Sequence, residues 1–340
     1  MNPYTLLFGK EPTEAISRAA QSSEIVESFE EGTQQIYMIT GVRGSGKTVF
    51  MTEISKELKQ QDDWITVELN SSQDLLHDLA TSLASENKLA QIFQRANINL
   101  SFFGIGLEVK GSVPITNVQV AISKMLENLK KHNKKVLICI DEVISTDYMK
   151  AFAGAFQIFV RQDLPIYLLM TGLYKNINNL QNEKNLTFLY RAPKVELKPL
   201  NINTISANYQ KTFKIAESQS LAMAKLTKGY SFAFQVLGHF TWKKDGDYKQ
   251  ALPDYQQYLE DYVYEKIWSG MSAGDKNLAY GIAKSETGKA KEIKEELGIE
   301  NNEYTPYRDR LVKRGLVDGS EHGRLKFTLP LFERYVINNY

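Results

Sequence analysis

Short apolar runs alternate with longer amphipathic stretches along the first 200 residues of this chain. Apolar runs without polar alternation are typical of strands buried on both faces of a parallel sheet. The stretches between them repeat apolar residues at helical spacing. Such alternation predicts right-handed crossovers and an α/β fold with a mostly parallel sheet. We predict strands at residues 35–39, 64–69, 136–140, 165–172 and 194–197, and helices at 12–31, 49–58, 72–94, 118–132 and 148–161.

The pattern changes twice further along the chain. Residues 97–116 are interrupted by three glycines, and we predict a short hairpin inserted at the edge of the core. From residue 201 to about 268 the signal is helical only, and from 271 it predicts three helices, a hairpin and a final helix. The expected domains are therefore an α/β core with an N-terminal leader (1–200), an all-α lid (201–269) and a C-terminal module (270–340).

The first predicted strand leads into the sequence GVRGSGKT at residues 41–48. It matches the phosphate-binding loop pattern G-x-x-x-x-G-K-[ST], and a helix follows it as that pattern requires. Glycines allow backbone N–H groups and the helix N-terminus to surround an anion. Lys47 is expected to reach the β- and γ-phosphates, and the Thr48 hydroxyl to bind Mg²⁺. The predicted nucleotide-binding residues are Gly41, Val42, Arg43, Gly44, Ser45, Gly46, Lys47, Thr48 and Val49.

Two carboxylates follow the third apolar run directly. Asp141 and Glu142 stand at its C-terminal end, which is the edge where parallel-sheet enzymes bind their ligands. Asp141 is expected to hold Mg²⁺ through water, and Glu142 to polarise an attacking water. The predicted cofactors are therefore ATP and Mg²⁺, and the predicted activity is that of a Mg²⁺-dependent ATPase.

The amino-acid composition restricts the partners and the cellular location that are expected for this chain. The 340 residues have a net charge of +1, so nothing drives the whole chain toward nucleic acid or an anionic membrane. The single cysteine, Cys139, lies inside the third apolar run and rules out a disulfide framework within the chain. The first ten residues lack the features of a signal peptide, and no apolar segment is long enough to span a membrane. A cytoplasmic location is expected.

These motifs resemble those of the AAA+/STAND group of nucleotide switches, especially its small initiator-like, origin-recognition-type ATPases with a C-terminal winged helix. The resemblance implies that Thr171, ending the strand 168–172, faces the γ-phosphate as a sensor; a simple strand-end hydroxyl is the alternative. It also implies that Arg191 is an arginine finger supplied to a neighbouring subunit. A surface salt bridge is the alternative for Arg191.

The sequence departs from this group in the lid. The stretch Gly229-Tyr230-Ser231 stands where STAND proteins carry Gly-x-Pro, and residues 229–239 contain no sensor-2 arginine. Slow turnover is therefore expected, and His239 is assigned to packing. Asn2-Pro3-Tyr4 and Phe8-Gly9 resemble the leader segment near the adenine; an arm anchored on the core by Tyr4 and Phe8 is the alternative.

The C-terminal module is similar to a winged helix. We predict that Thr305 caps its third helix, which begins at Pro306 and ends at Gly315. Helical spacing places Arg308 on the inner face, as a partner for an internal carboxylate. Arg310 and Lys313 are expected to project outward, with Arg314 at the margin, where they could contact DNA phosphates. However, residues 271–340 hold 12 basic and 11 acidic residues, and strong duplex binding usually requires a basic surface.

Three functions remain open at this point. The first is a slow ATPase that acts as a conformational switch and is controlled by assembly into a homo-oligomer. The second is a DNA-binding initiator or regulator in which ATP sets the affinity for double-stranded DNA. The third is a nucleotide-dependent protein-interaction module in defence or signalling. The intact Glu142 favours the first, the outward basic residues the second, and the nearly neutral charge the third.

Overall fold

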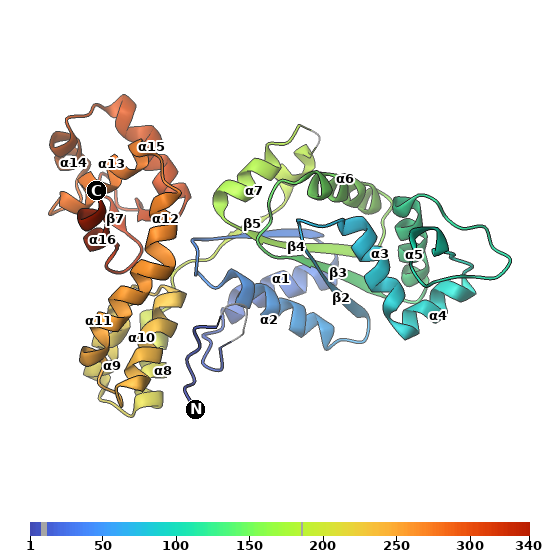
Figure 1. The fold of residues 1–340 in the computed structure, drawn as a ribbon, viewed down its shortest axis with the longest axis horizontal. Helices are drawn as coiled ribbons and strands as arrows, with labels where there is room; N and C mark the ends of the chain where they lie inside the picture. The colour runs from blue at the N-terminus through green and yellow to red at the C-terminus, as the bar shows by residue number, and fades with distance from the viewer. Residues whose placement is uncertain (8–11, 185) are drawn as a thin grey trace. The chain divides into compact units, whose positions relative to one another are not determined.

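The computed structural model describes residues 1–7, 12–184 and 186–340 (Figure 1). The chain forms two compact units. The sheet unit comprises Arg18–Thr40 and Lys47–Glu196, and the helical unit comprises Met1–Ser17, Gly41–Gly46 and Leu197–Tyr340. The phosphate-binding loop is thus divided between them, because its first six residues cluster with the helical unit.

A five-stranded parallel sheet forms the centre of the sheet unit, in the order β2-β3-β4-β1-β5. Strands β1, β3 and β4 are buried along almost their whole length, as expected for apolar runs inside a parallel sheet. The predicted α/β fold is confirmed. The strands are β1 (Ile36–Thr40), β2 (Trp64–Leu69), β3 (Lys135–Ile140), β4 (Ile166–Gly172) and β5 (Lys194–Glu196).

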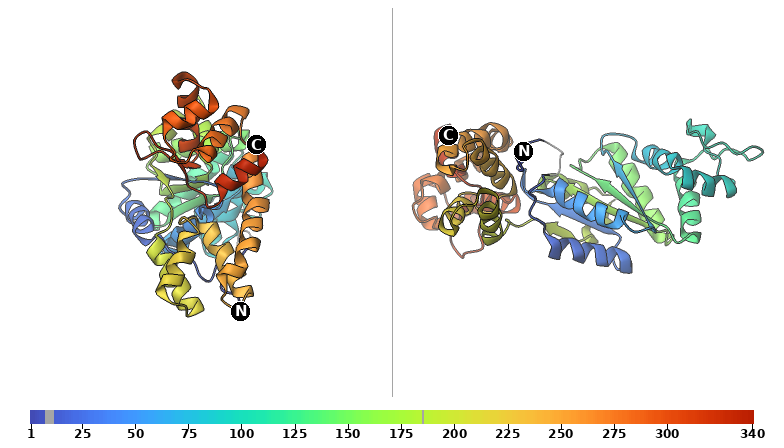
Figure 2. Two further views of the ribbon diagram at one scale, coloured as in Figure 1. Left: turned by 90° about the vertical axis from the view of Figure 1, so that its left-hand side faces the viewer. Right: turned by 90° about the horizontal axis from the view of Figure 1, so that it is seen from below.

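Helices cover both faces of this sheet (Figures 1 and 2). Helices α1 and α2 lie together on one face, and α6 and α7 lie on the other. On the face covered by α6 and α7, the apolar side chains of these two helices and of the strands belong to one continuous core. The helices of the sheet unit are α1 (Ala19–Glu31), α2 (Lys47–Lys59), α3 (Leu75–Ser85), α4 (Asn87–Arg95), α5 (Val118–Lys131), α6 (Asp147–Arg161) and α7 (Tyr174–Gln181), with the 3-10 turns η1 (Ser101–Phe103) and η2 (Thr187–Arg191).

Two predicted helices differ from the observed ones. The helix expected from residue 12 begins only at Ala19, because the residues before it use backbone groups elsewhere: Glu14 donates its N–H to Pro3, and its carbonyl accepts from Gln235. The helix expected over 72–94 is two helices, because Glu86 adopts an extended conformation between α3 and α4.

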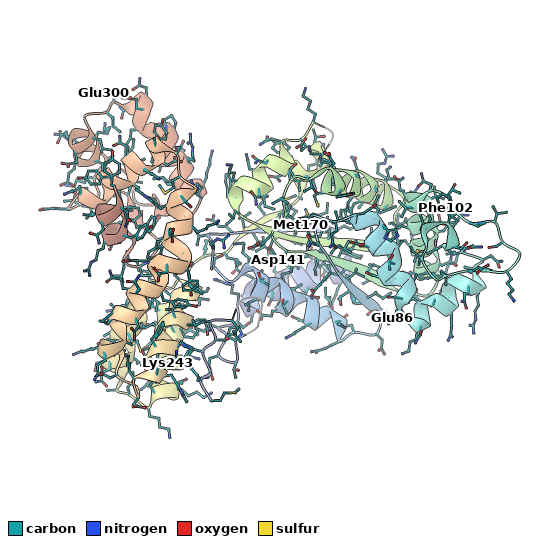
Figure 3. The ribbon with its side chains drawn as sticks, in the orientation of Figure 1. Glu86, Phe102, Asp141, Met170, Lys243 and Glu300 are labelled. Carbon is teal, nitrogen blue, oxygen red and sulfur yellow. The ribbon has the colours of Figure 1, made fainter. Side chains whose placement is uncertain are left out.

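The hairpin predicted at 97–116 is wrong. These residues, all of them described, contain η1 and turns but no strand. The buried side chain of Asn99 donates to the carbonyls of Val109 and Ser112 and accepts from Ser101, so the backbone is satisfied locally instead of in a ladder. Leu107 anchors this loop in the core, whereas Phe102 is exposed (Figure 3).

Bundled helices follow the sheet in the helical unit. The N-terminal arm packs among them: Tyr4 is 1% exposed, and its ring contacts those of Tyr209, Phe213 and Phe234. Gly238 makes room for it, since a Cβ there would lie 2.5 Å from the Tyr4 ring. The helices are α8 (Ile202–Phe213), α9 (Glu217–Lys225), α10 (Ser231–Lys243), α11 (Tyr248–Leu259), the π-helical turn η3 (Glu260–Tyr264) and α12 (Glu265–Ser269).

The last 70 residues contain three helices, a hairpin and a helix, in the predicted order. The start of the third helix is corrected, because α15 begins at Asn301, directly after the Glu300 labelled in Figure 3, and not at Pro306. Tyr304 is buried and anchors the added turn. The elements are α13 (Ala273–Lys284), α14 (Ala290–Leu297), α15 (Asn301–Lys313), β6 (Val317–Asp318), β7 (Lys326–Phe327) and α16 (Phe332–Asn339).

Among the described residues, none of the helices combines the length and apolarity needed to cross a membrane.

Candidate functional site

The loop at residues 41–46 connects β1 to the N-terminus of α2. Gly44 and Gly46 have φ values of 76° and 91°, which other residues rarely adopt. The loop bends back on itself, with the Ser45 N–H donating to the Val42 carbonyl over 3.2 Å. Lys47 is the first residue of α2. A helix N-terminus preceded by such a loop is an anion-binding arrangement, so these residues fit a phosphate group.

Asp141 joins the ends of three elements at the C-terminal edge of the sheet. Its Oδ2 accepts a hydrogen bond of 2.7 Å from the Thr48 hydroxyl at the start of α2. Its Oδ1 accepts from the buried hydroxyl of Thr171, at the end of β4. The sheet order explains this meeting, since β4 is the neighbour of β3 and its end lies beside the end of β3, which Asp141 follows.

The pair of Thr48 and Asp141 provides one hydroxyl and one carboxylate for a metal ion. No group of three or more His, Cys, Asp or Glu side chains able to hold a metal occurs in the part of the chain that the structure describes. Mg²⁺ suits so small a protein donor set, because it usually keeps several waters and is bound by one or two carboxylates together with substrate phosphates.

Glu142 follows Asp141 in an unusual conformation. Its φ is 49°, a left-handed value that is uncommon for glutamate and is typical of functional sites. Its N–H lies 3.0 Å from Asp141 Oδ1 and 3.3 Å from Thr171 Oγ1, so the same carboxylate and hydroxyl fix the turn. The Glu142 side chain itself is exposed and able to meet a water molecule.

Arg191 ends η2, shortly before β5, and is exposed. In the described part of the chain, no carboxylate lies within salt-bridge distance of it; the adjacent Tyr190 hydroxyl donates to Asn182.

The structure adds contacts to the loop that sequence reasoning missed. Tyr230, Ser231 and Phe232, at the start of α10, each donate a hydrogen bond to a carbonyl of residues 43–45. Burial raises the pKa of Tyr230, which keeps its hydroxyl protonated and able to donate. The residues concerned are 186 to 188 positions apart, and no local pattern signals such a contact.

The basic residues of α15 are only partly as predicted. Lys313 is exposed, but Arg310 and Arg314 lie 3.3 and 3.6 Å from the carboxylate of Asp275, whose side chain is 2% exposed. Arg308 was expected to be the partner of an internal carboxylate, and it instead contacts the half-exposed Asp309 and the Gly319 carbonyl. The buried carboxylate of Asp275 on α13 thus pairs with both Arg310, which the helical spacing placed on the outer face of the third helix, and Arg314, which it placed at the margin of that face.

The N-terminal arm lies on the helices, as its aromatic anchor suggested. His239 contacts the Asn2 amide and the Tyr4 carbonyl, in agreement with a packing role. Phe8 and Gly9, which resemble the leader of nucleotide switches, lie outside the described residues.

Residues 16–189 match a family profile described as an ATPase domain predominantly from Archaea. The chain belongs to this ATPase family. The matched range contains the phosphate loop, Asp141, Glu142 and Thr171. Residues 261–336 match a second profile, described as a domain of unknown function. No functionally curated protein is similar enough in sequence to be matched.

Solved structures show the same fold across the chain. A Walker-type ATPase of Pyrococcus abyssi is 16% identical with a TM-score of 0.69, covering 95% of this chain and 96% of that one. The ORC2 protein of Aeropyrum pernix, in ADPNP and ADP complexes, is 14% identical with a TM-score of 0.58, covering 97% and 95%. Cdc6p of Pyrobaculum aerophilum is 14% identical with a TM-score of 0.50, covering 96% of each chain.

Proposed function

We propose that this ATPase is a Mg²⁺-dependent conformational switch, which binds ATP, hydrolyses it slowly and transmits its nucleotide state to the C-terminal module at residues 270–340. The observation that carries the proposal is the arrangement around Asp141, whose two oxygens accept from Thr48 and Thr171. A site that needed only to hold phosphates would not require this arrangement together with Glu142.

The residues have distinct roles in this mechanism. Lys47 at the start of α2 neutralises the β- and γ-phosphates, and Thr48 and Asp141 hold Mg²⁺, which stabilises the negative charge of the phosphates. Glu142 orients and deprotonates the attacking water. Thr171 fixes the Asp141 carboxylate, and Arg191 is supplied to the site of a neighbouring copy. Slow turnover is expected because residues 229–239 provide no arginine for the phosphates.

Lys228 supports the coupling to the C-terminal module. Its ammonium group lies 3.4 Å from the Phe327 carbonyl, 3.3 Å from the Leu329 carbonyl and 3.4 Å from a carboxylate oxygen of Glu333. Lys228 lies two positions before Tyr230, the first residue of the segment 230–232 that contacts the phosphate loop. The loop and the module, a proposed winged helix, are therefore connected through a few consecutive residues.

Thermal unfolding with and without nucleotide tests the proposal. A ligand at about 100 times its Kd stabilises the folded state by about 2.7 kcal/mol. Mg-ATP should therefore raise the Tm of wild type by several degrees and leave the Tm of Lys47→Ala unchanged. Wild type should also release phosphate in a reaction that stops when EDTA removes Mg²⁺. Equal thermal shifts in both proteins, or phosphate release that EDTA does not affect, would contradict the assignment.

DNA binding by the C-terminal module is a second candidate, favoured by the exposed Lys313 on α15. Each lost phosphate contact reduces the slope of log affinity against log salt by about 0.9 for duplex DNA. Lys313→Ala should reduce the slope by about this amount, and adding Arg310→Ala should reduce it further only if Arg310 leaves Asp275 to reach DNA. Absence of duplex binding at low salt, with or without Mg-ATP, would favour a protein partner for the module.

A further inference from the structure

The start of α10 holds the backbone of the phosphate loop directly. The Tyr230 hydroxyl donates to the Arg43 carbonyl over 2.5 Å, and the Ser231 hydroxyl donates to the Ser45 carbonyl over 3.0 Å. Between these two bonds, the Phe232 N–H donates to the Gly44 carbonyl over 3.1 Å. Three consecutive residues of the helical unit thus bind three consecutive loop carbonyls. We call this set of bonds the loop clamp.

The loop clamp leaves no room for a side chain at Gly44. The phosphate-loop pattern leaves this position open to any residue. In this chain, a Cβ at Gly44 would lie 2.2 Å from the Tyr230 hydroxyl oxygen and 2.9 Å from the Phe232 Cβ. Its φ of 76° also excludes most side chains. The close approach of Tyr230 and Phe232 is therefore a second reason why position 44 requires glycine, and it is independent of the bend of the loop.

The clamp also fixes the direction of the neighbouring N–H groups. In a trans peptide unit, the N–H of one residue points opposite to the carbonyl of the residue before it, and the structure contains no cis peptide bond among the described residues. Holding the Arg43 and Ser45 carbonyls therefore holds the N–H groups of Gly44 and Gly46. These are the groups with which a phosphate loop binds its anion.

We propose that Tyr230 and Ser231 are positioning residues for nucleotide binding: their hydroxyls hold the loop in the shape that receives the phosphates. The inference rests on the proposed function and adds to it the means by which α10 acts on the site. The contact is made to the loop backbone and replaces, in this chain, the direct contact that an arginine would make to the nucleotide. Coupling is reciprocal, so nucleotide should in turn stabilise the clamp.

The test compares two tyrosines in the full-length chain. Tyr230→Phe removes only the hydroxyl that donates to Arg43. Tyr209→Phe is the matched control, because Tyr209 is also buried and its hydroxyl donates to a backbone carbonyl, that of Phe234, over 2.7 Å. Titration with ATP and with ADP should give Kd values about two- to tenfold higher for Tyr230→Phe than for wild type, the range for one hydrogen bond. Tyr209→Phe should bind like wild type.

A second measurement separates positioning from general loss of stability. Amide hydrogen exchange in residues 230–236 should slow when ADP binds to wild type and to Tyr209→Phe, and slow less in Tyr230→Phe. Ser231→Ala should weaken binding in the same direction, and Ser231→Thr, which keeps a hydroxyl, should recover part of the affinity.

Equal nucleotide affinity in wild type and Tyr230→Phe would overturn the inference and leave the proposed function intact. An equal loss in the Tyr209→Phe control would also overturn it, since any buried hydroxyl of the unit would then have the same effect. A wild-type chain that binds no nucleotide would overturn the proposed function first, and the inference with it.

Discussion

Thr171 and Asp141 stand at the ends of adjacent strands, and the hydroxyl of Thr171 donates to Asp141 Oδ1. The same hydroxyl also accepts from the N–H of Glu142, at 3.3 Å. One buried side chain therefore orients both the carboxylate proposed to hold Mg²⁺ and the backbone of the proposed general base. This assigns to Thr171 a role through Asp141 and Glu142, in addition to the contact with the γ-phosphate that the resemblance implies.

Thr171→Val keeps the shape of this side chain and removes its hydroxyl. We expect ATP affinity to change little and kcat to fall about tenfold, because the loss of one oriented hydrogen bond has about that effect. Steady-state kinetics that separate kcat from KM provide the measurement. Thr171→Ser should retain most of the activity. If Thr171→Val has the kcat of wild type, Thr171 is a simple strand-end hydroxyl with no role in hydrolysis.

Glu142→Gln should retain ATP binding and slow hydrolysis by about 10²–10⁴-fold, since the amide keeps the shape but not the basicity of the carboxylate. Single-turnover phosphate release measures this step without product dissociation. Glu196→Gln, at an exposed position in β5, is the control for removing a charge from the same unit and should behave like wild type. Unchanged turnover in Glu142→Gln would exclude Glu142 as the base.

Arg191→Ala tests assembly. If Arg191 acts in the site of a neighbouring copy, the specific activity of wild type should rise with protein concentration, whereas that of the variant should stay low and constant. Lys194→Ala, an exposed cation in β5, controls for charge. Specific activity of wild type that does not depend on concentration would argue against a finger supplied between copies.

Asp275→Asn should destabilise the C-terminal module by about 2 kcal/mol, because it removes the buried charge that pairs with Arg310 and Arg314. Asp309→Asn breaks the exposed pair with Arg308 and should cost less than about 1 kcal/mol. Denaturant unfolding of both variants against wild type gives the comparison. Equal stability of the two variants would show that the Asp275 cluster contributes no more than a surface pair.

The features that could be predicted from sequence are those encoded within a few neighbouring residues. The apolar runs identified β1, β3 and β4 because both faces of these central strands are buried, and the phosphate loop and the Asp141–Glu142 pair are contiguous motifs. The loop at 97–116 was predicted as a hairpin because its hydrogen bonds depend on the buried side chain of Asn99, which resembles an ordinary loop residue in sequence.

Contacts between distant residues could not be predicted in this way. Helical spacing around α15 gave the inner and outer faces but not the position of Asp275 on α13, which determines where Arg310 and Arg314 lie. The bond from Tyr230 to Arg43 joins residues 187 positions apart, and a tyrosine after a glycine does not indicate its partner.

The order of the strands also determines how sensitive the site is to changes in the core. Thr171 reaches Asp141 only because β4 pairs with β3 in one register, with Ile140 opposite Met170. A slip of one residue would move Thr171 about 3.3 Å along the sheet and turn its side chain to the other face. The packing of the buried apolar residues of β4, such as Leu168 and Met170, therefore determines the position of Thr171 relative to Asp141. Substitutions of these apolar residues that preserve stability but shift the register should lower the turnover of ATP, although the substituted side chains make no contact with ATP.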